Sequence, residues 1–337
     1  MLTSKKIKQF AIDKSGFDLI GIANIERFKD APKDMHPLTI FPDAKSVIVC
    51  AKRIPRGALR GIEEGTYWNA YDLFGCAKLN IRNMSGLYLL SKFIEKEGFE
   101  AVPLSVMATA WEFEEPARKR PNPNIGSDVQ LSIRLAAAAA GLGELGWSKI
   151  FLTPQFGPRQ RFVVMLTDAE LEPNPLFKGK LCIKCMKCIK DCPGGALGGK
   201  KIKVKIEDRV FEWGDIDLGK CKLCHFGLDR KCSPFLAKDM PGLRLDVKKQ
   251  KMTWKEAWDL GITYFPLVRH YRLQSYYLSN YPPAVCGAKG CIRSCMDELE
   301  KQKIIPGFRN DFIKRERWEE LPLEIEREDN RLWNYIK

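Results

Sequence analysis

The 337-residue sequence has no apolar run of membrane-spanning length and no recognisable export signal. The charge-free stretch at residues 135–143 is about half of the ~18 residues that a membrane span needs. Lysines stand at the N-terminal positions where a signal peptide has its apolar core, and no twin-arginine pair precedes such a core. We therefore expect a cytoplasmic protein with no membrane partner.

Internal repeats of solenoid length and low-complexity tracts are also missing, which excludes repeat and fibrous architectures. Hydrophobic residues make up 45% and charged residues 29%, as in a globular protein of about two domains. The 56 Lys and Arg exceed the 42 Asp and Glu, for a formal net charge of +14. This excess favours an acidic partner, either a small electron carrier or nucleic acid.

Apolar segments of helical and strand length alternate over residues 1–175 and predict an α/β domain whose strand order stays open. We expect strands at residues 17–23, 46–51, 99–104 and 161–167, and helices at 3–14, 77–98 and 131–140. A loop rich in proline and charge is expected at 114–124. A second domain is predicted at 176–300, and a helical extension at 301–337, with helical segments at 296–304 and 315–336.

Ten of the twelve cysteines lie between residues 182 and 295, and four of them form a motif typical of iron–sulfur proteins. Cys182, Cys185 and Cys188 are spaced to bind three irons of one cubane, and Cys192, followed by proline, is spaced to reach a second cluster. A zinc site would instead use paired CxxC units that close on one ion. We therefore predict two interlocked 4Fe-4S clusters and an electron-transfer function.

The second half-set of ligands is less regular. Cys286, Cys291 and Cys295 are its natural members, with Cys295 completing the first cluster and the other two joining Cys192 on the second. The remaining thiolate comes from the segment 221–232. Cys221 is favoured, Cys224 is an alternative, and Cys232 could compete with Cys295 for the first cluster. Outside this region, Cys50 and Cys76 are expected to be ordinary buried residues.

Three glycines match a dinucleotide-binding fingerprint in the wrong context. Gly141, Gly143 and Gly146 have the G-x-G-x-x-G spacing, with Asp168 about twenty residues later. The fingerprint must follow a strand and begin a helix, whereas this one follows the predicted helix at 131–140. We therefore do not expect a nicotinamide site, and expect these glycines to allow a large flat ligand to approach the backbone.

Four sequence runs leading into the cysteine motif closely resemble the corrinoid-dependent reductive dehalogenases, and more distantly epoxyqueuosine reductase. The runs are residues 127–133, 140–146, 152–161 and 167–173. The resemblance implies a nitroreductase-like cobalamin-binding α/β domain and a ferredoxin-like domain with two 4Fe-4S clusters. It implies cobalamin-binding residues at Asp128, Gly141, Leu142, Gly143, Phe156 and Gly157.

The scarcity of histidine agrees with a base-off corrinoid that has no protein axial ligand. The chain has three histidines. Asp34 and His36 begin the D-x-H-x-x-G pattern that a histidine ligand requires, but Thr39 stands at the glycine position. His36 is therefore expected to be an ordinary loop residue.

The family's catalytic residues map onto four positions. Tyr71 is the candidate proton donor, with Tyr67 as the next choice, although both could be core residues. Ser127 stands where the dehalogenases place an asparagine and the queuosine enzymes an aspartate. Arg159 and Arg161 match the arginines that stabilise negative charge near the substrate, although either could be in a surface ion pair.

These observations predict an oxygen-sensitive oxidoreductase that passes electrons through two clusters to cobalamin, which reduces a small substrate. Two alternatives stay open: an epoxyqueuosine reductase-like tRNA-modifying enzyme, and an electron-transfer protein that reactivates a partner's corrinoid. Nine lysines surround the cysteine motif and suit an acidic ferredoxin or flavodoxin, a tRNA backbone, or plain solvent. They are Lys178, Lys180, Lys184, Lys187, Lys190, Lys200, Lys201, Lys203 and Lys205.

Overall fold

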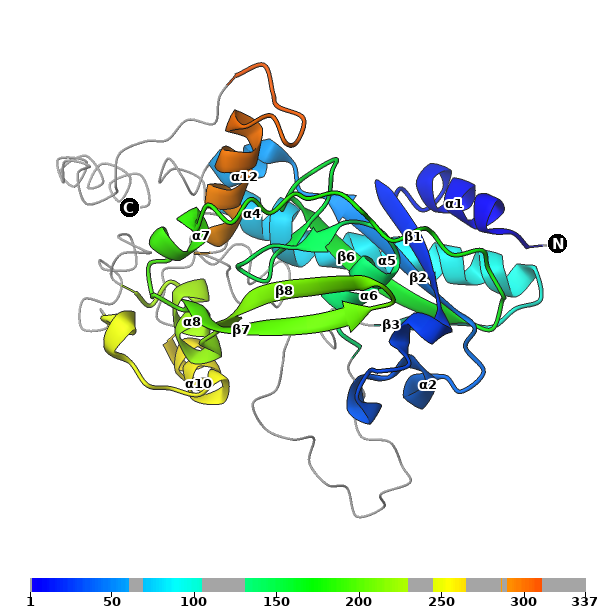
Figure 1. Cartoon of the computed structure of the whole chain (residues 1–337), viewed down its shortest axis with the longest axis horizontal. Helices are drawn as coiled ribbons and strands as arrows, with labels where there is room; N and C mark the ends of the chain where they lie inside the picture. Colours follow the sequence, from blue (N-terminus) through cyan, green and yellow to red (C-terminus); the bar gives the residue numbers. More distant parts are fainter. Residues whose placement is uncertain are drawn as a thin grey trace, which may run out of the picture.

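The computed structural model describes residues 2–60, 69–104, 131–229, 245–264, 286 and 290–310. The structure is mixed α/β, as predicted (Figure 1). The predicted loop at 114–124 and helical segment at 315–336 lie outside the described residues. No helix among the described residues is long and apolar enough to span a membrane.

An antiparallel sheet of four strands lies at the centre of the described chain. Its order is β1 (Leu19–Asn24), β2 (Ser46–Arg53), β6 (Gln160–Thr167) and β3 (Ala101–Leu104). All four were expected from their apolar runs. β2 and β6 are the two central strands and are covered on both faces. Their sequences are therefore nearly continuous in apolar residues.

Helices α1 (Ser4–Asp13) and α5 (Ala77–Lys96) pack on one face of the sheet. Ile7 of α1 and Leu90 of α5 meet Ile48 and Val163 in a common core. The Thr3 side chain caps α1 by accepting a hydrogen bond from the Lys6 amide. Both helices lie where the apolar spacing predicted them.

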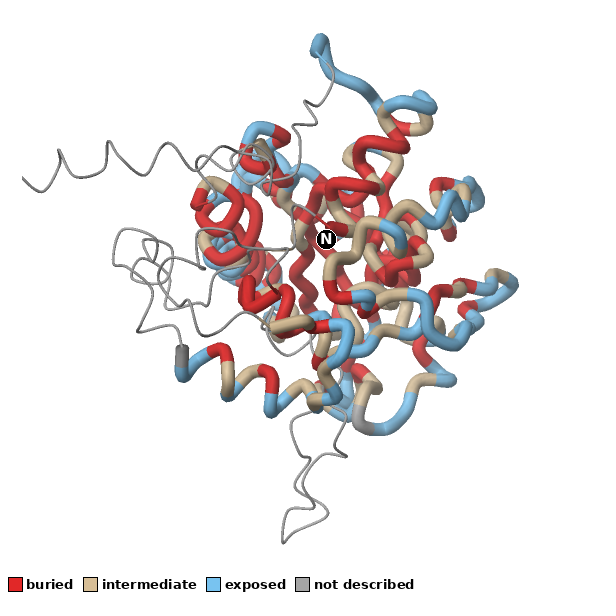
Figure 2. Tube along the Cα trace, turned by 90° about the vertical axis from the view of Figure 1, so that its left-hand side faces the viewer, coloured by how far each residue is buried: buried red, intermediate tan, exposed pale blue. Residues whose placement is uncertain are grey.

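The opposite face is covered by α6 (Ile133–Ala139) and by a hairpin of β7 (Leu197–Ile206) and β8 (Arg209–Ile216). The alanines of α6 allow a close approach to the sheet, and Phe211 and Trp213 of the hairpin join the same core. Arg27 fixes the tip of the hairpin, since its guanidinium binds Glu207 at 2.8 Å and the Ala139 carbonyl at 2.6 Å. The buried residues of both layers form the centre of Figure 2.

Apart from the β7–β8 hairpin, the described part of the cysteine-bearing region beyond residue 180 is built of short helices. These are α7 (Lys187–Lys190), α8 (Leu218–His225), α10 (Trp254–Tyr264) and α12 (Cys291–Lys301). The helix expected at 296–304 spans residues 291–301 instead. Cys291 and Cys295 therefore lie on its first turns. The remaining described elements are α2 (Pro37–Ile40), α4 (Asn69–Tyr71), β4 (Glu144–Leu145), β5 (Phe151–Leu152), a π turn (Asp72–Cys76) and 3-10 turns at Ile25–Phe28, Lys33–Met35, Arg56–Leu59 and Val247–Lys249.

Candidate functional site

Four thiols from two distant segments meet around one small cavity. Cys182, Cys185 and Cys188 of the motif line it together with Cys295 of α12, and we call these four group A. Burial raises the pKa of the Cys295 thiol, and the neighbouring Cys182, Cys188 and Cys185 raise it further. Such mutual repulsion between thiolates is relieved when they share a cationic metal centre.

Four other thiols form a second set, which we call group B: Cys192, Cys221, Cys286 and Cys291. Burial raises the pKa of Cys291, and the other three members of the group raise it further. Burial, Cys286, Cys224 and Cys192 together raise the pKa of Cys221 to about 12. Gly290 lies directly against Cys286, since a Cβ on this glycine would be 3.3 Å from the Cys286 sulfur.

The two groups exchange members across the sequence. Cys192 ends the first motif and lies with group B, whereas Cys295 follows the second set and lies with group A. Helix α12 joins the groups because Cys291 and Cys295 are one turn apart on it. Among the described side chains, no three histidines, cysteines or acids converge tightly enough to hold a single metal ion. The four sulfurs of each group match in number the four thiolates that one 4Fe-4S cluster takes.

Cys224 stays an alternative ligand, because it lies close enough to Cys221 to raise its pKa and Cys286 of group B packs against the same apolar cluster. Cys224 is buried in an apolar cluster with Phe226 and Val247, and its sulfur would be only 2.4 Å from a Cβ placed on Gly194. Cys232 lies outside the described residues. Cys50 and Cys76 are buried, as expected.

Glu144 anchors the first cysteine, a role that sequence reasoning missed. One carboxylate oxygen accepts hydrogen bonds from the amides of Leu181 at 2.5 Å and Cys182 at 2.7 Å. The other oxygen binds Arg209 of β8 at 2.8 Å. The signal was available, because Glu144 lies inside the run 140–146 that carries the resemblance.

Tyr71 and Arg161, two of the predicted catalytic residues, contact each other. The Arg161 guanidinium donates to the Tyr71 hydroxyl at 3.0 Å and to the Gly75 carbonyl at 2.9 Å. The tyrosine is 1% exposed at the start of the π turn Asp72–Cys76, a type of bulge that recurs at functional sites. Burial raises the pKa of Tyr71, while Arg161 lowers it. A phenol is protonated at neutral pH even without this shift, and its hydrogen is not used in the bond that Arg161 donates.

Further cations lie between this pair and group B. Lys222, which is 2% exposed, is held among aromatic rings, with its ammonium 4.2 Å from the Trp258 ring centre and 4.4 Å from that of Phe226. Burial lowers its pKa to about 7, and the adjacent Cys221 opposes that shift. Arg134 of α6 also interacts with Cys221. Sequence reasoning missed both cations because nothing in their local pattern places them beside thiols.

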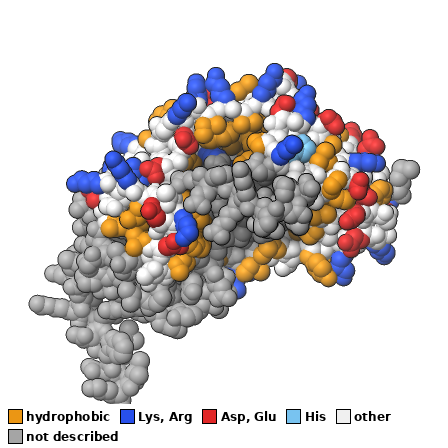
Figure 3. Space-filling view, turned by 90° about the horizontal axis from the view of Figure 1, so that it is seen from below, with side chains coloured by type: hydrophobic (Ala, Val, Ile, Leu, Met, Phe, Trp, Pro, Cys, Tyr) orange, Lys and Arg blue, Asp and Glu red, His pale blue; other side chains and the backbone are white. Residues whose placement is uncertain are grey.

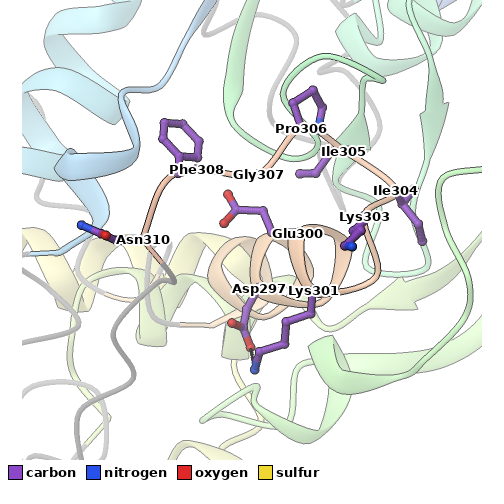
Figure 4. Close-up of a pocket in the computed structure, with 10 residues that line it drawn as sticks. All are labelled: Asp297, Glu300, Lys301, Lys303, Ile304, Ile305, Pro306, Gly307, Phe308 and Asn310. Carbon is purple, nitrogen blue, oxygen red and sulfur yellow. Dashed lines mark hydrogen bonds and ion pairs between the residues drawn. The ribbon is translucent and has the colours of Figure 1, made fainter.

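Arg159 lies apart from the Tyr71–Arg161 pair. Its guanidinium donates to the Ile54 carbonyl at 2.8 Å and stacks on Phe308. Next to it, Arg56 forms a buried ion pair with Glu300 of α12 at 2.9 Å. Glu300 and Phe308 both line an open pocket of about 660 Å³ at the end of α12 (Figure 4). The catalytic role of Arg159 stays a prediction.

The glycines that were expected to contact a flat cofactor instead lie against other parts of the chain. Gly141, at φ +72°, approaches the Pro175 carbonyl so closely that a Cβ there would be 2.1 Å from its oxygen. Gly143 approaches the Leu152 carbonyl in the same way. The G-x-G-x-x-G run follows α6 and leads into β4, so it lacks the strand–turn–helix context of a dinucleotide site.

The remaining predicted cofactor residues are only partly described. Gly157, at φ +56°, packs against Ile305, and Leu142 and Phe156 are half-buried beside the alanine-rich core. Ser127, Asp128 and Tyr67 lie outside the described residues. His36 lies between two short helices and accepts a hydrogen bond from the Leu38 amide.

The sequence comparisons find relatives among the expected enzymes, although no family model matches the chain. A tetrachloroethene reductive dehalogenase of Dehalobacter restrictus is 32% identical over 117 residues, which cover 34% of this chain and 17% of that protein. An epoxyqueuosine reductase of Listeria monocytogenes is 35% identical over 78 residues, which cover 23% of this chain and 20% of that protein. The chain thus spans about a fifth of the length of these relatives.

Solved structures of both kinds of enzyme are also similar. Epoxyqueuosine reductase from Bacillus subtilis has a TM-score of 0.46 at 15% identity, covering 89% of this chain and 83% of that one. A B12-dependent reductive dehalogenase has a TM-score of 0.45 at 16% identity, covering 92% of this chain and 41% of that one. The chain is therefore similar in sequence, over about a third of its length, to reductive dehalogenases and, over a shorter stretch, to epoxyqueuosine reductase, both of which are oxidoreductases.

Proposed function

We propose that this protein is a cobalamin-dependent iron–sulfur reductase of the reductive dehalogenase type, working in the cytoplasm on a small substrate. The observation that carries the proposal is the division of eight cysteines into groups A and B, with Cys192 and Cys295 exchanged between them. Such an exchange is the signature of an interlocked cluster pair.

The chain's own residues suit this function. Group A would hold one 4Fe-4S cluster and group B the other, and bound clusters supply one-electron transfer. The Tyr71 hydroxyl accepts a hydrogen bond from Arg161, which orients it and does not use the phenol hydrogen, and Arg161 also opposes the rise in pKa that burial causes. The guanidinium is also positioned to stabilise negative charge that develops on a substrate beside the phenol.

The fit to cobalamin is weaker than the fit to the clusters. The closest approaches of Gly141, Gly143 and Gly157 are to Pro175, Leu152 and Ile305 of the chain itself, so these glycines do not form an open cradle for a corrin ring. Cobalamin is therefore proposed from the family resemblance, and when bound it would supply low-valent cobalt as the reductant of the substrate.

Anaerobic purification with added cobalamin tests the proposal. Reconstituted protein should contain about eight irons. Bound cobalamin should give a Co(II) paramagnetic resonance spectrum without splitting from an axial imidazole nitrogen. A fully folded protein with four irons, or with zinc, would reject the cluster scheme. A protein that retains eight irons but binds no cobalamin would reject only the cobalamin part of the proposal.

An epoxyqueuosine reductase-like function is the second candidate, supported by the 35% identity over 78 residues. Tight tRNA binding with a steep salt dependence would favour it. Reduction of a partner's corrinoid without turnover of a small molecule would instead favour a reactivating electron-transfer protein.

A further inference from the structure

The outer face of the β7–β8 hairpin is a row of lysines. Side chains alternate along a strand, and Ile202 and Val204 pack inward on the core. Lys201, Lys203 and Lys205 therefore project outward, and all three are exposed. We call these three residues the lysine face. Lys and Arg side chains, with some acidic side chains among them, lie along the upper edge of the view in Figure 3.

The hairpin that carries this face is joined to group A by two sets of contacts. Glu212, which lies opposite Lys203, forms an ion pair with Lys184, which lies between the first two cysteines of the motif. Gly214 donates its amide hydrogen to the Trp147 carbonyl at 2.9 Å. Trp147 in turn donates its amide hydrogen to the Cys182 sulfur at 3.3 Å.

Group A has an exposed thiol directly after Lys184. Cys185 is exposed, and the adjacent Met186 is 37% exposed. Val210, opposite Lys205 on the hairpin, is 52% exposed. A small apolar contact area beside exposed lysines suits a transient protein complex, in which charge attracts the partner and the apolar atoms come into contact. One acid, Glu212, lies among these lysines and pairs with Lys201 at 3.8 Å as well as with Lys184.

We infer that an acidic one-electron carrier protein docks on the lysine face and delivers its electron at Cys185. The inference rests on the proposed function, because it requires a cluster at group A. In this step one electron passes from the reduced carrier to the oxidised cluster of group A, and no bond is made or broken. The lysine face attracts the carrier and orients it.

The same face suits nucleic acid less well. The three lysines span four residue steps, or about 13 Å of strand, which offers few phosphate contacts. Single-stranded nucleic acid also needs aromatic side chains on which its bases can stack. The two aromatic residues of the hairpin strands, Phe211 and Trp213, are buried in the core.

Stopped-flow reduction of the eight-iron protein by a reduced acidic flavodoxin tests the inference. The variant combines Lys201→Glu, Lys203→Glu and Lys205→Glu. The matched control combines Lys5→Glu, Lys6→Glu and Lys96→Glu, which make the same charge change at exposed sites on α1 and α5. At low ionic strength the first variant should lose at least about tenfold in rate while the control stays within about twofold. The difference should shrink as salt is raised.

Two further measurements separate the possible failures. Iron content and reduction by dithionite should be the same in all three proteins. If the wild-type chain assembles no clusters, the proposed function fails. If the clusters assemble and dithionite reduces them, but both variants accept electrons from flavodoxin equally fast, the docking inference is overturned. Loss of affinity for a 20-nucleotide RNA in the lysine-face variant, with unchanged flavodoxin rates, would assign the face to nucleic acid instead.

Discussion

Replacement of Glu144 should release the iron of group A while sparing that of group B. The carboxylate accepts hydrogen bonds from two backbone amides at the first cysteine, and binds Arg209 at 2.8 Å. The Glu144 side chain is 13% exposed, so water replaces these bonds poorly when the carboxylate is removed. The loop that carries Cys182 would therefore open more often.

The size of the effect follows from the number of bonds lost. Hydrogen bonds to a charged group contribute about 1.5–3 kcal/mol each, but the freed amides regain part of this from water. We therefore expect Glu144→Ala to favour loop opening by about 2–4 kcal/mol, or about 30-fold to 1,000-fold in the open population. Glu144→Gln keeps one acceptor oxygen and should lose about half of this free energy.

Release of iron to a chelator under anaerobic conditions measures the open population, because the chelator reaches the cluster only when the loop opens. In Glu144→Ala about half of the iron should leave at the faster rate, and the paramagnetic resonance signal of the second cluster should persist. Glu170→Ala, which removes an exposed acid, is the control. Equal acceleration of both halves of the iron, or release at the wild-type rate, would refute the anchoring role.

Five other substitutions test four separate predictions. Cys192→Ala should remove about four irons from group B and Cys295→Ala about four from group A, as iron analysis and paramagnetic resonance of each variant would show. Glu300→Gln breaks a buried ion pair and should destabilise the fold by about 3–5 kcal/mol in anaerobic urea unfolding; a change under 0.5 kcal/mol would contradict that reading. Burial lowers the pKa of Lys149 to about 8, so the native state binds fewer protons than the unfolded state between pH 8 and the usual lysine pKa of 10.5. Stability should therefore rise with pH across that window, and Lys149→Met should abolish the rise. Arg161→Met should lower turnover by about 100-fold while keeping the iron content, and unchanged turnover would remove Arg161 from the site.

Much of the α/β region could be predicted from local pattern. The four strands of the sheet and helices α1, α5 and α6 lie where apolar spacing placed them, because burial on one or both faces leaves a periodic trace in the sequence. The β7–β8 hairpin was missed, although Lys201, Ile202, Lys203 and Val204 alternate as a strand does. The lysines at every second position predict a charged surface, and together with Ile202 and Val204 they also have the period of two of a strand.

For the candidate site, the sequence by itself determined which residues can be ligands. The spacing of Cys182, Cys185, Cys188 and Cys192 is a covalent property of a short segment, and it limits which irons each sulfur can reach. It could not determine which later cysteine joins which group, because that depends on how chain segments about a hundred residues apart pack together.

Tertiary structure alone decided those long-range pairings. It brought Arg161 to the hydroxyl of Tyr71, ninety residues earlier, and Glu144 to the amide of Cys182. It also buried Lys222 beside Cys221, where no local pattern predicts a cation. The physical reason is common to all three: their energies come from burial and from hydrogen bonds between distant segments, so they exist only once the layers of the fold have assembled.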